Sequence, residues 1–366
     1  MATSDQEPDD LSLHDLIEGP TQDLTSARAA LAARATPPVE PTQDLSALVP
    51  PRSVDHEVGG TSGDPQRRQL HDRPGGGPGA RRRVDLARVP AAGGLYRRAL
   101  LGALPGTGRR RGRELPALEL SVAGVTVDRA HLADYDRVCG FRLADRLPAT
   151  YLHVLGFPLS LRLMTAADFP IPLTGVVHVA NRITVRRPVQ VGESVDFRTY
   201  AENLRPHERG RQLDVVLVGS VGGEEVWRGV STYLGKERAA GGGPRRDRGD
   251  RQPPPAFSAQ WRVTPRVGTD YARVSGDHNP IHTSKLGARL FGFPRPIAHG
   301  MWSKARCLAA LESRLPEAYT VDVAFKLPVP LPSTVAFSAT TTGGAGWDFG
   351  LHGARDGRPH LVGTVR

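Results

Sequence analysis

An aspartate and a histidine on one short segment, Asp277 and His282, form a pair suited to moving protons near neutral pH. A carboxylate and an imidazole that converge can hold one water molecule between them and exchange protons with it. Asn279 precedes Pro280 within this segment, and a residue before proline is pushed toward extended backbone. We therefore expect an irregular segment that presents both groups to a single water.

A backbone hydrogen-bond donor is expected close by, at Gly300. This glycine follows His299 and opens an apolar-periodic run from Met301 to Leu315, which predicts a helix. The first amides of a helix have no partner within the helix, so the amide of Gly300 can stabilise a developing oxyanion. A carboxylate, an imidazole and such a donor are the three groups that a hydration site needs.

The residues around this pair form a longer pattern that resembles the signature of the MaoC-like dehydratases. The family consists of (R)-specific enoyl-thioester hydratases with a hot-dog fold. The resemblance implies that Asp277 and His282 are catalytic and that the Gly300 amide binds the thioester carbonyl. It rests on Tyr271-x-x-Val274-Ser275-Gly276-Asp277-x-Asn279-Pro280-Ile281-His282, on Gly292-Phe293 and on Pro296-Ile297-x-His299-Gly300. Within it, the residues that would shape the site are Ser275, Gly276, Asn279, Pro280 and His299.

Two stretches of the chain recur in the same order at nearly the same spacing, which indicates an internal duplication. Residues 135–140, YDRVCG, resemble residues 271–276, YARVSG. Residues 188–197 resemble residues 328–337 in the same way. We therefore expect two copies of one domain in tandem, with the first copy's Tyr-x-Arg-Val motif on a short strand and irregular segment, as in the second.

The first copy, called the first unit, covers residues 91–236, and the second unit covers residues 257–366. The same elements are expected in the same order in both units. A long apolar helix, residues 152–164 or 301–315, precedes a series of β-rich runs. This α+β pattern is typical of a sheet wrapped around a helix. We expect a double hot-dog whose two sheets join edge to edge, because such pairing removes exposed strand edges.

The first unit is expected to be catalytically degenerate. By the spacing of the repeated motif, Asp277 corresponds to Phe141 and His282 to Arg146, so no acid–base pair stands there. In two-copy members of the family, the resemblance implies, such a unit makes room for the acyl chain. A proline in the sequence Gly-Phe-Pro at residues 156–158 is expected to interrupt its helix. His153 and His178 are interpreted as structural histidines.

Two segments have compositions that do not support a core. Residues 1–90 are rich in Pro, Gly, Asp and Arg without a sustained period, so we expect a disordered extension whose removal leaves activity intact. Residues 237–256 contain Gly-Gly-Gly-Pro and Pro-Pro-Pro and are expected to be a linker.

Charge and composition exclude several classes of function. The net charge is +10, but no aromatic residues interleave with the arginine clusters, so nucleic-acid binding is not expected. No apolar run is long enough to span a membrane. Cys139 and Cys307 have no metal or redox spacing, and the acidic N-terminus does not read as a signal peptide, so a cytoplasmic protein is expected.

Three functions remain open from the sequence. The resemblance favours hydration of trans-2-enoyl thioesters, or dehydration of (R)-3-hydroxyacyl thioesters, in fatty-acid or related acyl metabolism. The alternatives are a hot-dog acyl-CoA thioesterase and a non-catalytic acyl-binding or assembly subunit. No metal or redox cofactor is expected, and coenzyme A or acyl carrier protein would enter with the substrate. The chain length and the carrier stay open, as does the choice between a monomer of the fused pair and a homodimer.

Overall fold

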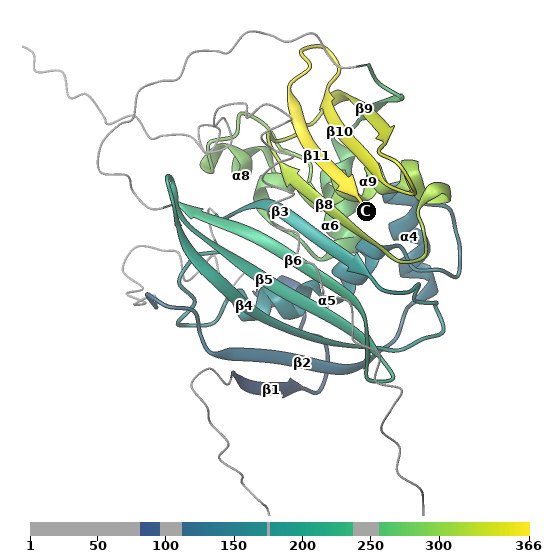
Figure 1. The fold of residues 1–366 in the computed structure, drawn as a ribbon. Helices are drawn as coiled ribbons and strands as arrows, with labels where there is room; N and C mark the ends of the chain where they lie inside the picture. The colour runs from purple at the N-terminus through teal and green to yellow at the C-terminus, as the bar shows by residue number, and fades with distance from the viewer. Residues whose placement is uncertain (1–80, 96–111, 174–175, 237–255) are drawn as a thin grey trace, which may run out of the picture.

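The computed structural model of the protein describes residues 81–95, 112–173, 176–236 and 256–366, which form two units joined side by side (Figure 1). The elements of the first unit are β1 (Arg82–Leu86), β2 (Leu118–Val125), α4 (Arg129–Cys139), α5 (Ala149–Met164), β3 (Val176–Val185), β4 (Val195–His207), β5 (Gly210–Val221) and β6 (Glu224–Lys236). Those of the second are β7 (Ala259–Val263), α6 (Arg266–Ser275), α7 (Pro280–Thr283), α8 (Lys285–Leu290), α9 (Gly300–Leu311), the 3-10 turn η1 (Glu312–Arg314), β8 (Tyr319–Phe325), β9 (Ser333–Thr341), β10 (Trp347–Gly353) and β11 (Pro359–Val365).

The two units have one topology, so the expected double hot-dog is confirmed. All of the strands above join one sheet in the order β1-β2-β4-β5-β6-β3-β8-β11-β10-β9-β7. The run β2-β4-β5-β6-β3 of the first unit matches β7-β9-β10-β11-β8 of the second, with β1 as an addition to the first. Edge strands β3 and β8 pair antiparallel and make the seam between the units, as the edge-to-edge expectation required.

A long helix packs on the sheet in each unit. Helix α5 contacts β2, β4 and β5, and Figure 1 shows it behind these strands. It is buried at most positions, as a helix enclosed by a sheet should be. A Cβ on Gly156 would lie 2.5 Å from the Leu217 side chain, so glycine lets the helix approach β5 closely. Pro158 lies inside α5 without ending it, and the expected interruption is wrong.

Polar side chains bind the seam together. The Arg182 guanidinium donates to both carboxylate oxygens of Asp322, at 2.9 and 2.8 Å. Deeper, the fully buried Lys304 of α9 donates from Nζ to the backbone carbonyls of Asn181 and Val321 and to Asn181 Oδ1. Burying an ammonium costs several kcal/mol, and each charge-assisted hydrogen bond returns about 1.5–3 kcal/mol. Because these roughly cancel, Lys304 specifies the position of α9 more than it adds stability.

The Tyr-x-Arg-Val-x-Gly motifs lie on helices, not on a short strand and irregular segment as expected. They form the ends of α4 and α6, and in each the glycine is a left-handed C-cap, Gly140 with φ 83° and Gly276 with φ 71°. Helices often end this way, because glycine adopts positive φ without steric cost. The first helix begins at Asp128, whose side chain accepts from the amide of Ala130, an N-cap signal visible in the sequence.

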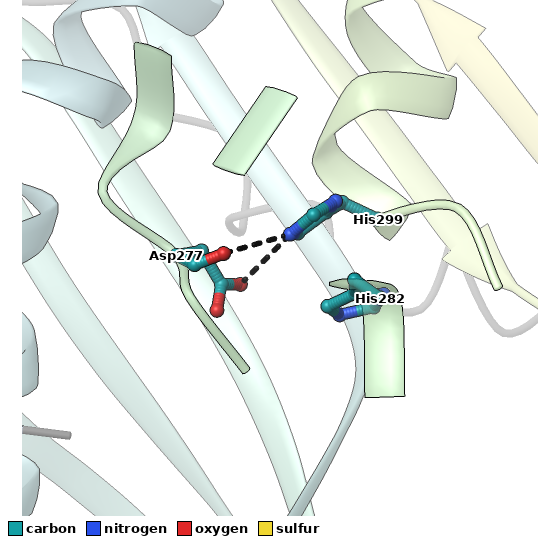
Figure 2. A group of neighbouring side chains, drawn as sticks. All are labelled: Asp277, His282 and His299. Carbon is teal, nitrogen blue, oxygen red and sulfur yellow. Dashed lines mark hydrogen bonds and ion pairs between the residues drawn. The ribbon is translucent and has the colours of Figure 1, made fainter. Parts of the chain in front are cut away.

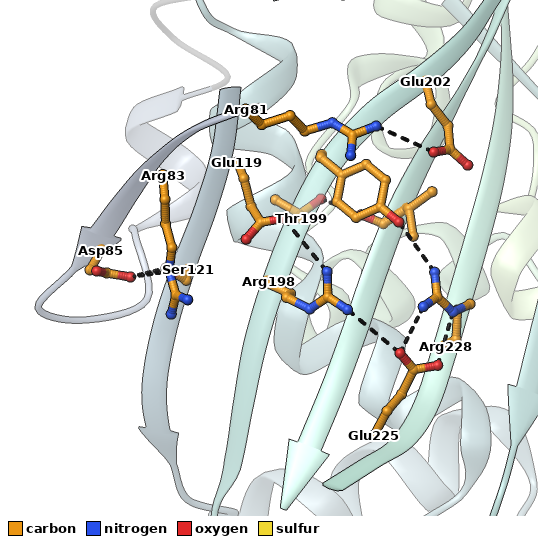
Figure 3. Close-up of polar contacts among 12 residues, drawn as sticks. Arg81, Arg83, Asp85, Glu119, Ser121, Arg198, Thr199, Glu202, Glu225 and Arg228 are labelled. Atoms are coloured by element: carbon orange, nitrogen blue, oxygen red, sulfur yellow. Dashed lines mark hydrogen bonds and ion pairs between the residues drawn. The ribbon is translucent and has the colours of Figure 1, made fainter. Parts of the chain in front are cut away.

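Strand β1 lies within residues 1–90, and for residues 82–86 the expected disorder is wrong. It pairs parallel with β2. Arg81 lies over the Tyr200 ring at 4.0 Å. Figure 3 shows Arg81 beside Glu202, to which it donates, and Asp85 beside Ser121, from which it accepts. The same picture shows Arg198, Glu119, Glu225 and Arg228 continuing this network across the outer face of the sheet. Residues 1–80, 96–111 and 237–255 lie outside the described residues, and most of the expected extension and linker are among them.

Deletion of residues 1–90 tests the contribution of β1. We expect a melting temperature lower by a few degrees, because Val84 and Leu86 pack against the core and the ladder to β2 is lost. Exposed ion pairs add little, so most of the effect should come from the strand. The matched control lacks only residues 1–80 and keeps β1. Equal melting temperatures for the two truncated proteins would show that β1 adds no stability.

Candidate active site

Asp277 lies on the loop that connects α6 to α7, directly after the capping glycine Gly276. Its amide donates to Ser275 Oγ at 3.2 Å, and its Oδ1 accepts from the amide of Asn279 at 3.2 Å. The bond from the Asn279 amide forms an Asx-type turn that fixes the carboxylate. The side chain is 26% exposed and therefore keeps some access to solvent.

His282 lies in α7, a single helical turn. Asn279 caps this turn by accepting from the amide of Ile281, and Pro280 occupies its first position, where a missing N–H costs nothing. The imidazole is buried, and its Nδ1 lies 2.8 Å from the Ile297 carbonyl oxygen. A carbonyl only accepts, so Nδ1 carries the proton and Nε2 keeps its lone pair. This tautomer leaves His282 able to accept a proton through Nε2.

His299, the residue before α9, completes the cluster in Figure 2. Its Nε2 donates to the backbone carbonyl of Asp277 at 3.0 Å and lies 3.9 Å from the carboxylate. Its ring stacks on that of His282 with centroids 3.7 Å apart, and Tyr271 packs beside it at 4.9 Å. His299 therefore ties the aspartate loop to the start of α9.

Gly300 is the first residue of α9, where the helix leaves its amide without an internal partner. A Cβ at this position would lie 3.1 Å from the Phe325 ring, so a side chain here would force the ring to move. Glycine thus permits an aromatic ring on β8 to cover the helix start. The amide lies one residue from His299 and hence at the edge of the same cluster.

Burial keeps the histidines of the cluster neutral. It lowers the pKa of His282, an effect that the Asp277 charge opposes. It lowers the pKa of His299 to about 3, and the neighbouring His282 adds to that effect. A neutral imidazole can take a proton, whereas an imidazolium cannot, so the low-dielectric site favours a base role for His282.

The same three side chains have the spacing of metal ligands. One ligand atom from each of Asp277, His282 and His299 lies within 4.8 Å of the others. One ring nitrogen of each histidine is already bonded to a backbone carbonyl. Imidazole and carboxylate suit several divalent ions, so chelation belongs among the tests of the site.

The first unit lacks the segment that carries His282. Leu147 donates to Val189 as Ala298 donates to Val329, and each pair immediately precedes the long helix of its unit. Arg146 therefore corresponds to Ile297, and the predicted correspondence with His282 is wrong. Helices α7 and α8 have no counterpart among the described residues of the first unit.

The first unit supplies aromatic side chains next to Phe325, among them His178, which was interpreted as a structural histidine. His178 stacks on Tyr233 at 4.7 Å and contacts Phe325 at 5.0 Å, beside Gly300. A β-bulge next to His178 shifts the register of β3, a device common near active sites. The Asp277 charge raises the pKa of His153, His178 and Tyr233, although burial is the largest influence on each of the three groups.

Comparisons with known proteins find similar sequences and structures. The MaoC-like domain matches residues 250–356. The 3-hydroxyacyl-thioester dehydratase X of Mycobacterium tuberculosis is 42% identical over 272 residues, 74% of this chain and 95% of that protein. The chain belongs to the MaoC-like dehydratase family. A crystal structure of HtdX from the same organism, 41% identical, covers 68% of this chain and 99% of that one with a TM-score of 0.61. An (R)-specific enoyl-CoA hydratase of Rhodospirillum rubrum is 38% identical over 77 residues, 20% of this chain and 54% of that protein.

The buried histidines of this MaoC-like protein predict acid sensitivity. Below the ordinary histidine pKa of about 6.5, the unfolded chain binds protons that native His299 does not, so stability falls as pH drops toward 3. His299→Gln can still donate to the Asp277 carbonyl, and it should make the decline shallower by up to about 1.4 kcal/mol per pH unit. Urea unfolding at several pH values between about 4 and 7 measures this slope. Parallel curves for the two proteins would contradict the assignment of a neutral buried His299.

Proposed function

We propose that the protein catalyses (R)-specific hydration of trans-2-enoyl thioesters, or the reverse dehydration of (R)-3-hydroxyacyl thioesters, in fatty-acid or related acyl metabolism. The observation that carries the proposal is the convergence of the Asp277 carboxylate and the His282 imidazole beside the start of α9. The names of the related dehydratase and hydratase support it.

The proton chemistry follows from the two side chains. Asp277 and the free Nε2 of His282 hold one water molecule and accept one of its protons. Its oxygen bonds to C3 of the substrate, and the electron pair of the C2–C3 double bond moves toward the thioester carbonyl. The same pair of residues then delivers a proton to C2, which gives the 3-hydroxyacyl product.

Gly300 serves the carbonyl end of the substrate. Negative charge that develops on the thioester oxygen is met by its amide, an unpaired donor at a helix N-terminus. One donor of this kind is typically worth about 3–4 kcal/mol in the transition state. His299, Ser275, Gly276, Asn279 and Pro280 hold the loop and the helix start in register.

The proposal needs neither a metal nor a redox cofactor, because the carboxylate, imidazole and amide account for each proton and charge. Coenzyme A or acyl carrier protein enters as the carrier of the acyl group. No nucleic-acid or membrane partner is part of the proposal. Of the described helices, none has the length and apolar content to cross a membrane.

Location and assembly complete the proposal. Cys139 and Cys307 are both buried and free, which fits a reducing, cytoplasmic location. The seam pairs the two units within one chain, so a monomer of the fused pair is sufficient and a homodimer remains compatible with it.

Mixing the protein with crotonyl-CoA separates the candidate functions. Hydration removes the absorbance of the enoyl-thioester band without releasing thiol, and we expect this outcome, unchanged by a chelator. Release of free thiol would indicate the thioesterase alternative. Binding of the thioester without either change would indicate a non-catalytic acyl-binding subunit.

Substitutions of the pair test the assignment of the site. Asp277→Asn and His282→Ala should each lower kcat/KM by about 10²–10⁴-fold. The double variant should be hardly worse than the worse single variant, because the loss of either residue disables the shared water. Kinetics with a trans-2-enoyl-CoA, together with thermal melting, measures both effects.

Variants in the first unit provide the control. Phe141→Leu and Arg146→Ala should change only stability or substrate range, since neither lies on a counterpart of α7. A well-folded Asp277→Asn enzyme with near-full activity, or an inactive but folded Arg146→Ala enzyme, would place the site in the wrong unit.

A further inference from the structure

Lys304 is a fully buried lysine on the helix that carries Gly300. Its Nζ lies 2.6 Å from Asn181 Oδ1, 3.1 Å from the Asn181 carbonyl oxygen and 3.2 Å from that of Val321. All three neighbours are acceptors in this arrangement, and only an ammonium has three N–H groups to offer them. These three contacts favour the charged form of the side chain, whereas burial lowers its pKa to about 7.

The corresponding position of the first unit is neutral. Because Leu147 and Ala298 correspond, α5 begins at Ala149 where α9 begins at Gly300, and Lys304 corresponds to His153. His153 is also buried, and burial lowers its pKa to about 4, so it carries no charge near neutral pH. Helix α5 thus packs in its unit with a neutral histidine at this position. The packing of the long helix alone therefore does not explain why α9 has a lysine there.

The ammonium lies among the elements that surround the Gly300 amide. Lys304 is one helical turn after Gly300, and helical side chains lean toward the N-terminus of their helix. Its acceptor Val321 is on β8, the strand whose Phe325 covers Gly300. The charges of Lys304 and Asp277 act in opposite directions on the pKa values of His153 and His178, since Lys304 lowers them and Asp277 raises them.

We propose that Lys304 is a positioning residue for the reaction, whose cation holds the first turn of α9 at the seam and favours negative charge on an oxygen bound at Gly300. The inference rests on the proposed function. A fixed charge in a buried site stabilises a developing opposite charge more strongly than the same charge in water. The substrate carbonyl is neutral before the reaction and carries charge in the transition state. The effect should therefore appear in kcat and not in KM.

Two substitutions separate the charge from the structural tie. Lys304→Met keeps an unbranched chain and removes the cation, and kcat should fall about 10- to 100-fold with KM little changed. Asn181→Asp keeps an oxygen beside Nζ but neutralises the ammonium with a carboxylate. A purely structural tie would survive this change, whereas we expect kcat to fall. Thr184→Val removes a hydroxyl contact with Thr320 at the same seam without changing charge, and it is the control.

Hydration of crotonyl-CoA by the wild-type enzyme tests the proposed function in the same assay. If the wild type is active and Asn181→Asp keeps its kcat, the role of Lys304 is overturned while the function stands. The role is also overturned if Lys304→Met folds and has a raised KM with an unchanged kcat. It is overturned as well if Thr184→Val lowers kcat as much as Lys304→Met does. If Lys304→Met does not fold, Asn181→Asp decides alone. If the wild type hydrates nothing, both proposals fail.

Discussion

The antiparallel pairing of β3 with β8 is the constraint on which the rest of the molecule depends. Each unit alone would end in a strand with unpaired amides and carbonyls, and the seam satisfies both edges at once. The charged pair of Arg182 with Asp322 aligns the two strands at one level. Below it, Lys304 aligns α9 with the same strands. The position of the helix start, and so of Gly300, follows from how the two units meet.

Two copies of one framework differ chiefly by an insertion. The strand order and the contacts before the long helices agree between the units, yet only the second has α7 and α8 between the capping glycine and the long helix. Asp277 lies just before the inserted segment, and His282 lies within it on α7, so the insertion places the two side chains next to each other. The first unit, without the insertion, instead places His178 and Tyr233 next to Phe325. The candidate acid–base pair and part of its surroundings thus come from different units.

The architecture could be predicted because its signals are local and repeated. Period-two runs marked the strands, the apolar run after Gly300 marked α9, and the recurrence of two motifs marked the duplication. The pair Asp277 and His282 could be named because the sequence separation between them is short. The contribution of His299 to the loop could be expected only through the family pattern, because its bond to the Asp277 carbonyl depends on tertiary packing.

Three of the expectations that failed did so for the following physical reasons. A constant spacing between repeats cannot locate an insertion, and so Arg146 was aligned with His282 although it corresponds to Ile297. The proline at 158 was expected to break a helix, but an enclosed helix gains enough from packing to tolerate it. Strand β1 was missed because five residues in a polar stretch show little pattern until β2 supplies their partners. The role of Lys304 had no local signal at all, since its acceptors come from β3 and β8.

The opposing residues of the seam also bear on how such a chain can change over time. Arg182 stands opposite Asp322, and Asn181 opposite Val323. If two identical polypeptides met at this edge, every substitution would appear at both ends of the contact, and a buried ammonium would need matching acceptors twice. In a fused chain the two sides of the seam differ, so a single buried lysine such as Lys304 needs acceptors such as the Asn181 amide only once. A fused chain can therefore carry different polar groups on the two sides of the seam, each of which is costly to bury but needs only one partner.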